Sequence, residues 1–276
     1  MIDDLLAITE CGCKSVETNA FINSQFELKN LNFNKTKCHQ IHVGKKNENC
    51  PKLKAHQDEI IKVSQDKYLG DIISSNGNND ENIKVKVSNG MGAISNVLNI
   101  LKEVSLGEYY FQIAFLLRQS IFLSTLLLNS ETWVNLTEKN IEELEKVDHI
   151  IMKRIFEAPV TTPIKALYLE SGCYPIRYHI KARRVMFLHY LLNRNPNELV
   201  SKILHAQIDD PTKNDWFKTV TKDLEDLGLD YLEIEEIKNM KKETFKKIVK
   251  EKCDDIVLTY VLKGNDTKSK LKDLRY

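Results

Sequence analysis

An apolar stretch near the middle of the chain, residues 109–128, constrains the fold more than any other segment. Its length approaches that of a membrane-spanning helix, but Gln112, Arg118, Gln119 and Ser120 interrupt it. A central arginine is costly in lipid, so we interpret the stretch as a helix buried in protein. Because the stretch is apolar on nearly all sides, it predicts the centre of a helical bundle.

Arg118 is the charged exception in this helix, and a buried charge needs a partner. We expect it to pair with an acid such as Glu131 or Asp148, the alternative being contact with the backbone of a nucleic-acid duplex. Asp148 lies on an apolar helical stripe that Thr137 is placed to cap. The stripe consists of Ile141, Leu144, Ile151 and Ile155.

Loop and proline signals divide the chain into three expected parts. Residues 74–80 form the strongest loop signal, and Pro159 and Pro163 mark a second boundary. The segment before the first boundary has short strand patterns, whereas the rest is helical in pattern. We predict an α+β fold, mostly α, with a small antiparallel sheet at the N-terminus followed by a helical bundle and further helices. The expected domains are 1–76, 77–158 and 159–276.

The composition is that of a globular protein without a strong charge bias. The 276 residues include 42% hydrophobic and 29% charged residues, and the net charge is +1. Binding to nucleic acid would therefore depend on local basic patches. Six scattered cysteines and no signal-like N-terminus predict reduced thiols in the cytoplasm or nucleus, with no secretion and no membrane partner.

One cysteine and histidine grouping has the right residue types for zinc but not the right spacing. It consists of Cys38, His39, His42 and Cys50. Common zinc modules supply a paired C-x-x-C or a comparable ligand spacing, and this group supplies neither. We therefore do not predict a zinc site here.

Two adjacent carboxylates, Asp3 and Asp4, lie within an otherwise apolar run at residues 1–8. The run has the pattern of a buried strand, and burying unpaired charge costs several kcal/mol. Divalent metal can compensate such charges, since Mg²⁺ prefers hard oxygen ligands and stabilises the oxygens of a phosphoryl transfer. The pair alone is a weak signal, and the following segments add to it.

Three motifs in this order resemble the palm of a reverse transcriptase, most closely that of non-LTR (LINE-type) retrotransposons. They are the Asp3-Asp4 run, residues 31–38 (LNFNKTKC) and residues 67–73 (KYLGDII). The likeness continues through residues 107–131, 167–172 and 175–194, which resemble the thumb and the post-thumb region. Met1 stands where the family usually has Tyr or Phe.

The resemblance implies roles for particular residues in an intact enzyme. Asp3 would be the principal Mg²⁺ ligand and Asp4 its accessory, because adjacent strand residues point to opposite faces. Lys37 would assist the leaving pyrophosphate, and Tyr68, Leu69 and Gly70 would form a hairpin that supports the primer. RNA template and DNA primer would be the partners, and Mg²⁺ the cofactor. The alternatives without a catalytic role are that Lys37 is a solvated lysine and that Tyr68, Leu69 and Gly70 form an ordinary hairpin with a glycine bulge.

The helix expected from Pro175 to about Asn195 carries the best basic patch. Its weakly predicted nucleic-acid contacts are Arg177, Lys181, Arg183 and Arg184. Cations along one helix can follow a phosphate backbone, although a charged helix is more often a solvated face.

The chain departs from the family in ways that affect its expected activity. A polymerase of this kind needs a third metal-binding Asp and a fingers region, which would precede Asp3. We therefore expect the chain to be a C-terminal fragment that does not extend primers by itself. The alternatives are a non-catalytic helical module that binds nucleic acid or a protein partner, and a decayed retroelement product with no cellular role.

Overall fold

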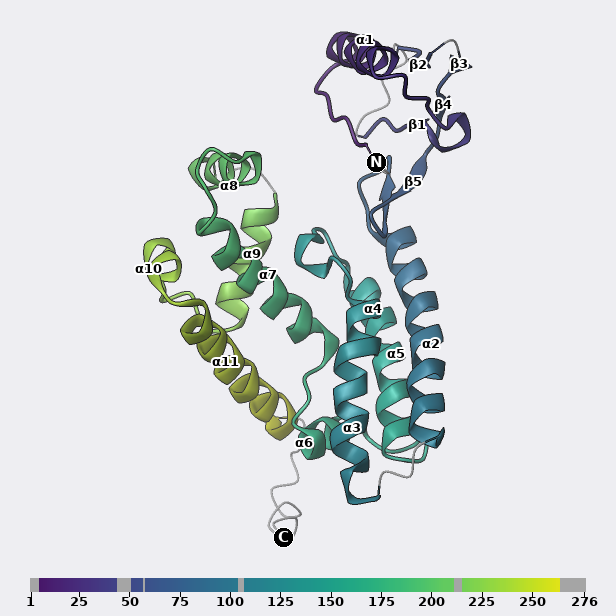
Figure 1. Cartoon of the computed structure of the whole chain (residues 1–276). Helices are drawn as coiled ribbons and strands as arrows, with labels where there is room; N and C mark the ends of the chain where they lie inside the picture. Colours follow the sequence, from purple (N-terminus) through teal and green to yellow (C-terminus); the bar gives the residue numbers. More distant parts are fainter. Residues whose placement is uncertain (1–4, 44–50, 57, 104–106, 211–214, 264–276) are drawn as a thin grey trace. The chain divides into compact units, whose positions relative to one another are not determined.

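A computed structural model describes residues 5–43, 51–56, 58–103, 107–210 and 215–263 (Figure 1). Its contacts divide the chain into two compact units, Met1–Asn82 and Ile83–Tyr276, which are described separately below. The described residues are mostly helical, with a few short strands near the N-terminus, as predicted. The division after Asn82 lies near the expected boundary at 76. Residues on both sides of the second expected boundary, at 158, belong to one unit.

The first unit contains one long helix, α1 (Gly12–Leu28), and three short strand pairs. Serine is a more usual N-cap than cysteine, yet the helix begins not after Ser15 but after Cys11, whose extended backbone and side chain cap the first turn. Ser15 lies inside the helix and donates to the Cys11 carbonyl at 3.0 Å. The side chains of Asn19 and Asn23 donate to the carbonyl of Lys54, at 3.0 and 2.8 Å, and so attach the helix to β2.

Two of the three strand pairs are antiparallel, as expected, and one is parallel. The parallel pair corrects the purely antiparallel sheet that we predicted, and its cause is the long connection between its strands, which lets the chain return in the same direction. The parallel pair is β1 (His39–Gln40) with β4 (Ile61–Lys62). The antiparallel pairs are β2 (Lys54–Ala55) with β3 (Asp58–Glu59), and β5 (Gln65–Tyr68) with β6 (Asp71–Ser74).

The described residues of the second unit form helices and connecting loops, and one face of the apolar stretch is buried in this unit. Tyr109, Phe111 and Leu116 are exposed, so the stretch is not buried on nearly all sides as we predicted. Ala114, Phe122 and Leu126 are each 0% exposed. The helix has a π-helical segment, Arg118–Leu123, between α3 (Tyr110–Leu117) and α4 (Ser124–Leu126). The other helices are α2 (Asp80–Glu103), α5 (Glu138–Ile155), α6 (Ile164–Ser171), α7 (Ile176–Leu192), α8 (Leu199–Asp209), α9 (Trp216–Asp226), α10 (Ile234–Asn239) and α11 (Lys242–Lys263).

Two hydrophobic cores meet along α7. Ile176 and Ile180, in its first half, belong to the core formed with α2, α3 and α5. Val185 and Leu188, in its second half, belong to the core formed with α8, α9 and α11. One helix therefore joins the two helical parts that we had expected to be separate domains, because its apolar residues face both.

Local signals explain where several helices begin and end. Thr137 caps α5 as predicted and forms a capping box with Asn140. Pro163 and Pro175 occupy the positions before the first residues of α6 and α7, and Gly172, with φ of 64°, ends α6.

Gly90 allows a close contact between α2 and its neighbours. A Cβ atom there would lie 2.8 Å from Leu126 Cδ1 and 3.3 Å from Val147 Cγ1, whereas one at Gly92 would meet nothing within 4 Å. α2 runs uninterrupted through both glycines. Gly90 is therefore a packing position.

None of the helices in the described ranges is both long and apolar enough to cross a membrane.

Candidate functional site

The predicted Mg²⁺ ligands, Asp3 and Asp4, lie outside the described residues, as does Cys50 of the rejected zinc grouping. Within the described ranges, no three or more His, Cys, Asp or Glu side chains come together in a way that could hold a metal ion. The described residues therefore supply no metal centre, and the magnesium site stays a prediction from the resemblance.

Lys37 and the Tyr68 hairpin belong to segments that the first unit brings together. Lys37 is exposed at the end of a short 3₁₀ turn, Lys35–Lys37, in which its N–H donates to the Asn34 carbonyl at 3.0 Å. Two residues later, Nδ1 of His39 lies 2.7 Å from Oδ2 of Asp66, in β5. This contact joins the segment that carries Lys37 to the strand that ends at Tyr68.

The hairpin tip has an unusual backbone. Tyr68 pairs with Asp71 across the turn, which leaves Leu69 and Gly70 as a two-residue loop with φ values of 46° and 89°. Two positive φ angles are typical of the tight type I′ turn, in which Asn and Gly are favoured. A leucine in this conformation is strained, and its side chain is 63% exposed. The pairing continues in register to Ser74, so the loop is tight and has no bulge.

A buried side chain attaches the hairpin to the helix that follows. The carboxamide oxygen of Asn82, in the first turn of α2, accepts a hydrogen bond from the Ile72 N–H at 3.1 Å. Asn82 is only 2% exposed, so the contact is shielded from water. The hydrogen bond therefore links the hairpin to Asn82, the last residue of the first unit.

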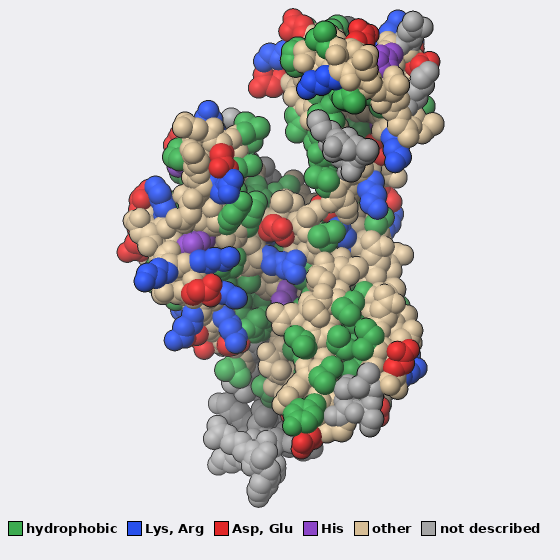
Figure 2. Space-filling model, in the orientation of Figure 1, with side chains coloured by type: hydrophobic (Ala, Val, Ile, Leu, Met, Phe, Trp, Pro, Cys, Tyr) green, Lys and Arg blue, Asp and Glu red, His purple; other side chains and the backbone are tan. Residues whose placement is uncertain are grey.

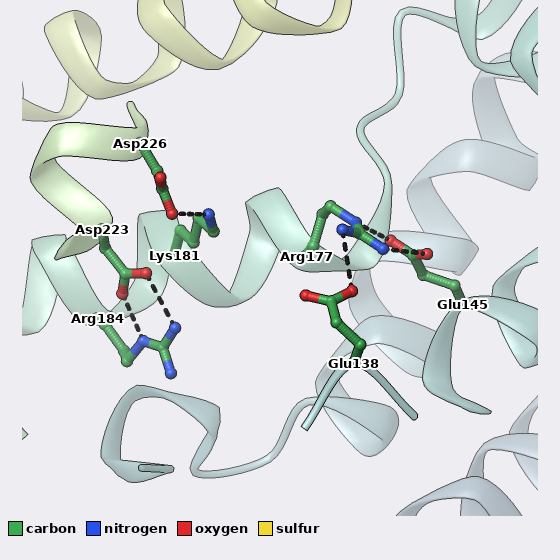
Figure 3. A network of polar contacts seen from close by, with 7 residues as sticks. All are labelled: Glu138, Glu145, Arg177, Lys181, Arg184, Asp223 and Asp226. Carbon is green, nitrogen blue, oxygen red and sulfur yellow. Dashed lines mark hydrogen bonds and ion pairs between the residues drawn. The ribbon is translucent and has the colours of Figure 1, made fainter. Parts of the chain in front are cut away.

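Arg177 and Lys181 of the predicted basic patch form ion pairs with acidic residues of the same unit (Figure 3). Arg177 donates to both carboxylate oxygens of Glu145, at 2.8 and 3.1 Å. These hydrogen bonds raise the pKa of Arg177 above its usual value, despite partial burial. Lys181 forms an ion pair with Asp226 of α9. Both cations are therefore neutralised within the unit.

Arg183 and Arg184 face the protein interior. Arg184 donates two hydrogen bonds to Asp223, at 2.6 and 3.0 Å, and a third to the Trp133 carbonyl at 2.9 Å (Figure 3). Arg183 donates to the Leu127 carbonyl at 2.5 Å, at the end of α4, where carbonyl groups lack helical partners. Burial lowers the pKa of Arg183.

The four predicted nucleic-acid contacts therefore stabilise the helical unit, and they do not form an unpaired cationic strip. On the face shown in Figure 2, basic side chains in the region of α7 and α11 lie among acidic ones. A phosphate backbone would have to compete with Glu145, Asp226 and Asp223 for these cations. The sequence analysis missed two acidic residues of α9, Asp223 and Asp226. They lie three residues apart, so both can pair with cations of α7.

Arg118 pairs with Asp148, as predicted, and a third residue completes the buried group. Nε and Nη2 of Arg118 donate to Oδ1 of Asp148, at 3.0 and 2.6 Å. The hydroxyl of Tyr168 donates to the other carboxylate oxygen at 2.8 Å. All three side chains are almost fully enclosed, and burial raises the pKa of Tyr168 far above its usual value. The group is a structural brace between α5, α6 and the π-helical segment.

A hollow near α7 has the wrong charge for a phosphate group. It measures about 490 Å³ and lies between the end of α9 and α11. Its lining includes three acids, Glu225, Asp226 and Asp255, and one cation, Lys252. This excess of negative charge would repel a nucleic-acid backbone.

No protein-family model, curated protein or solved structure matches this chain.

Proposed function

We propose that the chain carries the end of the palm, the thumb and the post-thumb region of a non-LTR retrotransposon reverse transcriptase, and that it holds an RNA–DNA duplex. In this proposal the first unit is the end of the palm, and the helices after Asn82 are the thumb and post-thumb region. The observation that carries the proposal is the tight Tyr68-Leu69-Gly70 hairpin with its exposed tip, because the resemblance implies that these three residues support the primer.

The surroundings of the hairpin support this role. The His39–Asp66 contact joins its first strand to the segment of Lys37, the proposed assistant of the leaving group. The Ile72–Asn82 hydrogen bond joins its second strand to the last residue of the first unit. A loop held at both strands can present Leu69 in one orientation at low entropic cost.

The proposal assigns duplex contact to the hairpin and to Lys37, and not to α7. Lys37 is exposed, and its positive charge is suited to a phosphate. The cations of α7 are bound to Glu145, Asp223, Asp226 and backbone carbonyls, so they support the fold. The proposal includes no catalytic step, since Mg²⁺ coordination rests on Asp3 and Asp4 by resemblance alone.

Fluorescence anisotropy with a labelled RNA–DNA hybrid tests the proposal. We expect Lys37→Ala to lower affinity and to reduce the dependence of affinity on salt by about one phosphate contact. We expect Tyr68→Ala to lower affinity by about fivefold or more, which corresponds to about 1 kcal/mol of lost base or sugar stacking. Lys146→Ala and Tyr231→Ala, at exposed positions in the second unit, are the matched controls. Equal effects of all four substitutions, or no binding at all, would contradict the proposal.

A second candidate function is a helical module for a protein partner. The pairing of the α7 cations favours it, as does a group of exposed apolar side chains around α3. Tyr109, Phe111 and Leu116 are 57%, 47% and 63% exposed, and Figure 2 shows hydrophobic side chains gathered over that region. Binding of the hybrid that is weak and independent of salt would favour this alternative.

A further inference from the structure

Two thiols lie side by side at the start of α1. Cys11 precedes the first helical residue, Gly12, and Cys13 follows it. Their Sγ atoms are 2.7 Å apart, and both residues are exposed. A disulfide bond is about 2.05 Å long, so joining the two sulfurs needs only a small movement of the side chains.

We propose that Cys11 and Cys13 form a reversible redox pair that is oxidised by small disulfides of the glutathione type. Cys11 is the attacking thiol and Cys13 is the resolving thiol. The oxidation of this cysteine pair does not depend on the proposed duplex binding.

The helix start distinguishes the two sulfurs. Sγ of Cys11 accepts a hydrogen bond from the Lys14 N–H at 3.5 Å, at the helix end where N–H groups lack partners and the dipole favours negative charge. The Cys13 thiol and this N–H lower the pKa of Cys11, whereas the neighbouring Cys11 raises the pKa of Cys13. The order of attack follows, because a thiolate is the nucleophile in disulfide exchange.

The reaction balances in two steps. The Cys11 thiolate attacks one sulfur of the small disulfide, forms a mixed disulfide with it and releases one small thiolate. Cys13 then gives its proton to solvent, attacks Sγ of Cys11 and releases the second small thiolate. Two protein thiols are oxidised to one disulfide, and one small disulfide is reduced to two thiols.

The other cysteines of the described residues lack this combination of exposure and a neighbouring thiol. Cys253 is buried, and burial raises its pKa to about 11. Burial also raises the pKa of Cys38. A ring closed between residues two apart is small, and strained disulfides of this kind are easily reduced, which suits a reversible response.

Equilibration of the whole chain with mixtures of reduced and oxidised glutathione tests the proposal, with alkylation and intact-mass measurement as the readout. We expect the two thiols to be lost together, and peptide mapping to find one bond between Cys11 and Cys13. In Cys13→Ser, one glutathione should remain attached at Cys11. In Cys11→Ser, adduct formation should be at least several-fold slower, and Cys173→Ser should behave as the wild type.

Three outcomes would overturn the proposal. The first is that both thiols stay reduced at high proportions of oxidised glutathione. The second is that Cys11 bonds to a different cysteine. The third is that Cys13→Ser accumulates no mixed disulfide, which would show that Cys11 is not the attacking thiol. Because the readout is mass and not binding, each outcome is independent of the proposed duplex function.

Discussion

Arg118 and Asp148 form a buried ion pair in which two guanidinium nitrogens donate to a single carboxylate oxygen. Burial alone would lower the pKa of Arg118, but the charge and hydrogen bonds of Asp148, together with Cys173 and Tyr168, more than offset this effect, and the pKa lies above its usual value. The pair joins the π-helical segment to α5. Tyr168 adds α6 to the same contact through the other carboxylate oxygen.

Removal of one partner from this pair should be strongly destabilising. We expect Asp148→Ala to lower the free energy of unfolding by about 3–5 kcal/mol, because it leaves a buried arginine unpaired. The double variant Arg118→Met, Asp148→Leu should recover much of this loss, since it removes both charges. Urea unfolding of the wild type, the single variants Arg118→Met and Asp148→Leu, and the double variant measures the coupling, and additive effects of the two single substitutions would contradict a direct pair.

Tyr168→Phe tests the third member of the group. It retains the ring and removes only the hydroxyl that donates to Asp148. The expected loss is about 1.5–3 kcal/mol, the range for a hydrogen bond to a charged group. Tyr231→Phe, at a residue that is 60% exposed, is the control and should change stability by less than about 0.5 kcal/mol.

Two glycines of α2 should respond in opposite directions. Gly92→Ala should stabilise the protein by about 0.5–1 kcal/mol, because it meets no neighbour and alanine is the better helix former. Gly90→Val should destabilise it by about 1–3 kcal/mol, because the new side chain would meet Leu126 and Val147. Thermal unfolding measures both changes, and a stabilising Gly90→Val would contradict the close packing.

His179 should make the protein less stable in mild acid. Its Nε2 atom is enclosed without a hydrogen-bond partner, and burial, with the nearby Arg118 and Arg183, lowers its pKa to about 3. Unfolded histidine titrates near pH 6.5, so only the unfolded state gains this proton between about pH 6.5 and 3. Stability should therefore fall as the pH is lowered through that window.

A comparison with His179→Gln separates this effect from the titration of other groups. Between pH 6 and 4 the wild type should lose more than about 1 kcal/mol relative to the variant, since one pKa unit corresponds to about 1.4 kcal/mol. Urea unfolding at several pH values provides the measurement. Parallel pH profiles of the unfolding free energy for the two proteins would show that the pKa of His179 is similar in the folded and the unfolded state, which would contradict the prediction.

The sequence predicted the helical core more completely than the charges around it. Apolar periodicity predicted the helix at residues 109–128 and the α5 stripe. The need to pair a buried arginine pointed to Glu131 or Asp148, and the structure has Asp148 as the partner. The cations of α7 were harder to interpret, since their partners, Asp223 and Asp226, lie on another helix far along the chain. The sequence also favours a start of α1 after Ser15, because serine is the more usual N-cap residue. In the structure Cys11 caps this helix.

The site was only partly predictable for a similar reason. A tight turn at Tyr68-Leu69-Gly70 follows from its glycine and the flanking apolar residues, and its position in a hairpin was expected. The contacts that orient it, His39 with Asp66 and Ile72 with Asn82, depend on which strands pair. Strands of only two residues carry too short a pattern to predict that pairing.

Hydrogen exchange of the whole chain with and without an RNA–DNA hybrid is the most direct test of the proposed duplex-holding role. We predict slower exchange at residues 65–74, a protection that weakens as salt is raised, and unchanged exchange in α7. Protection confined to α7, or none in the hairpin at low salt with the hybrid in excess, would contradict the account.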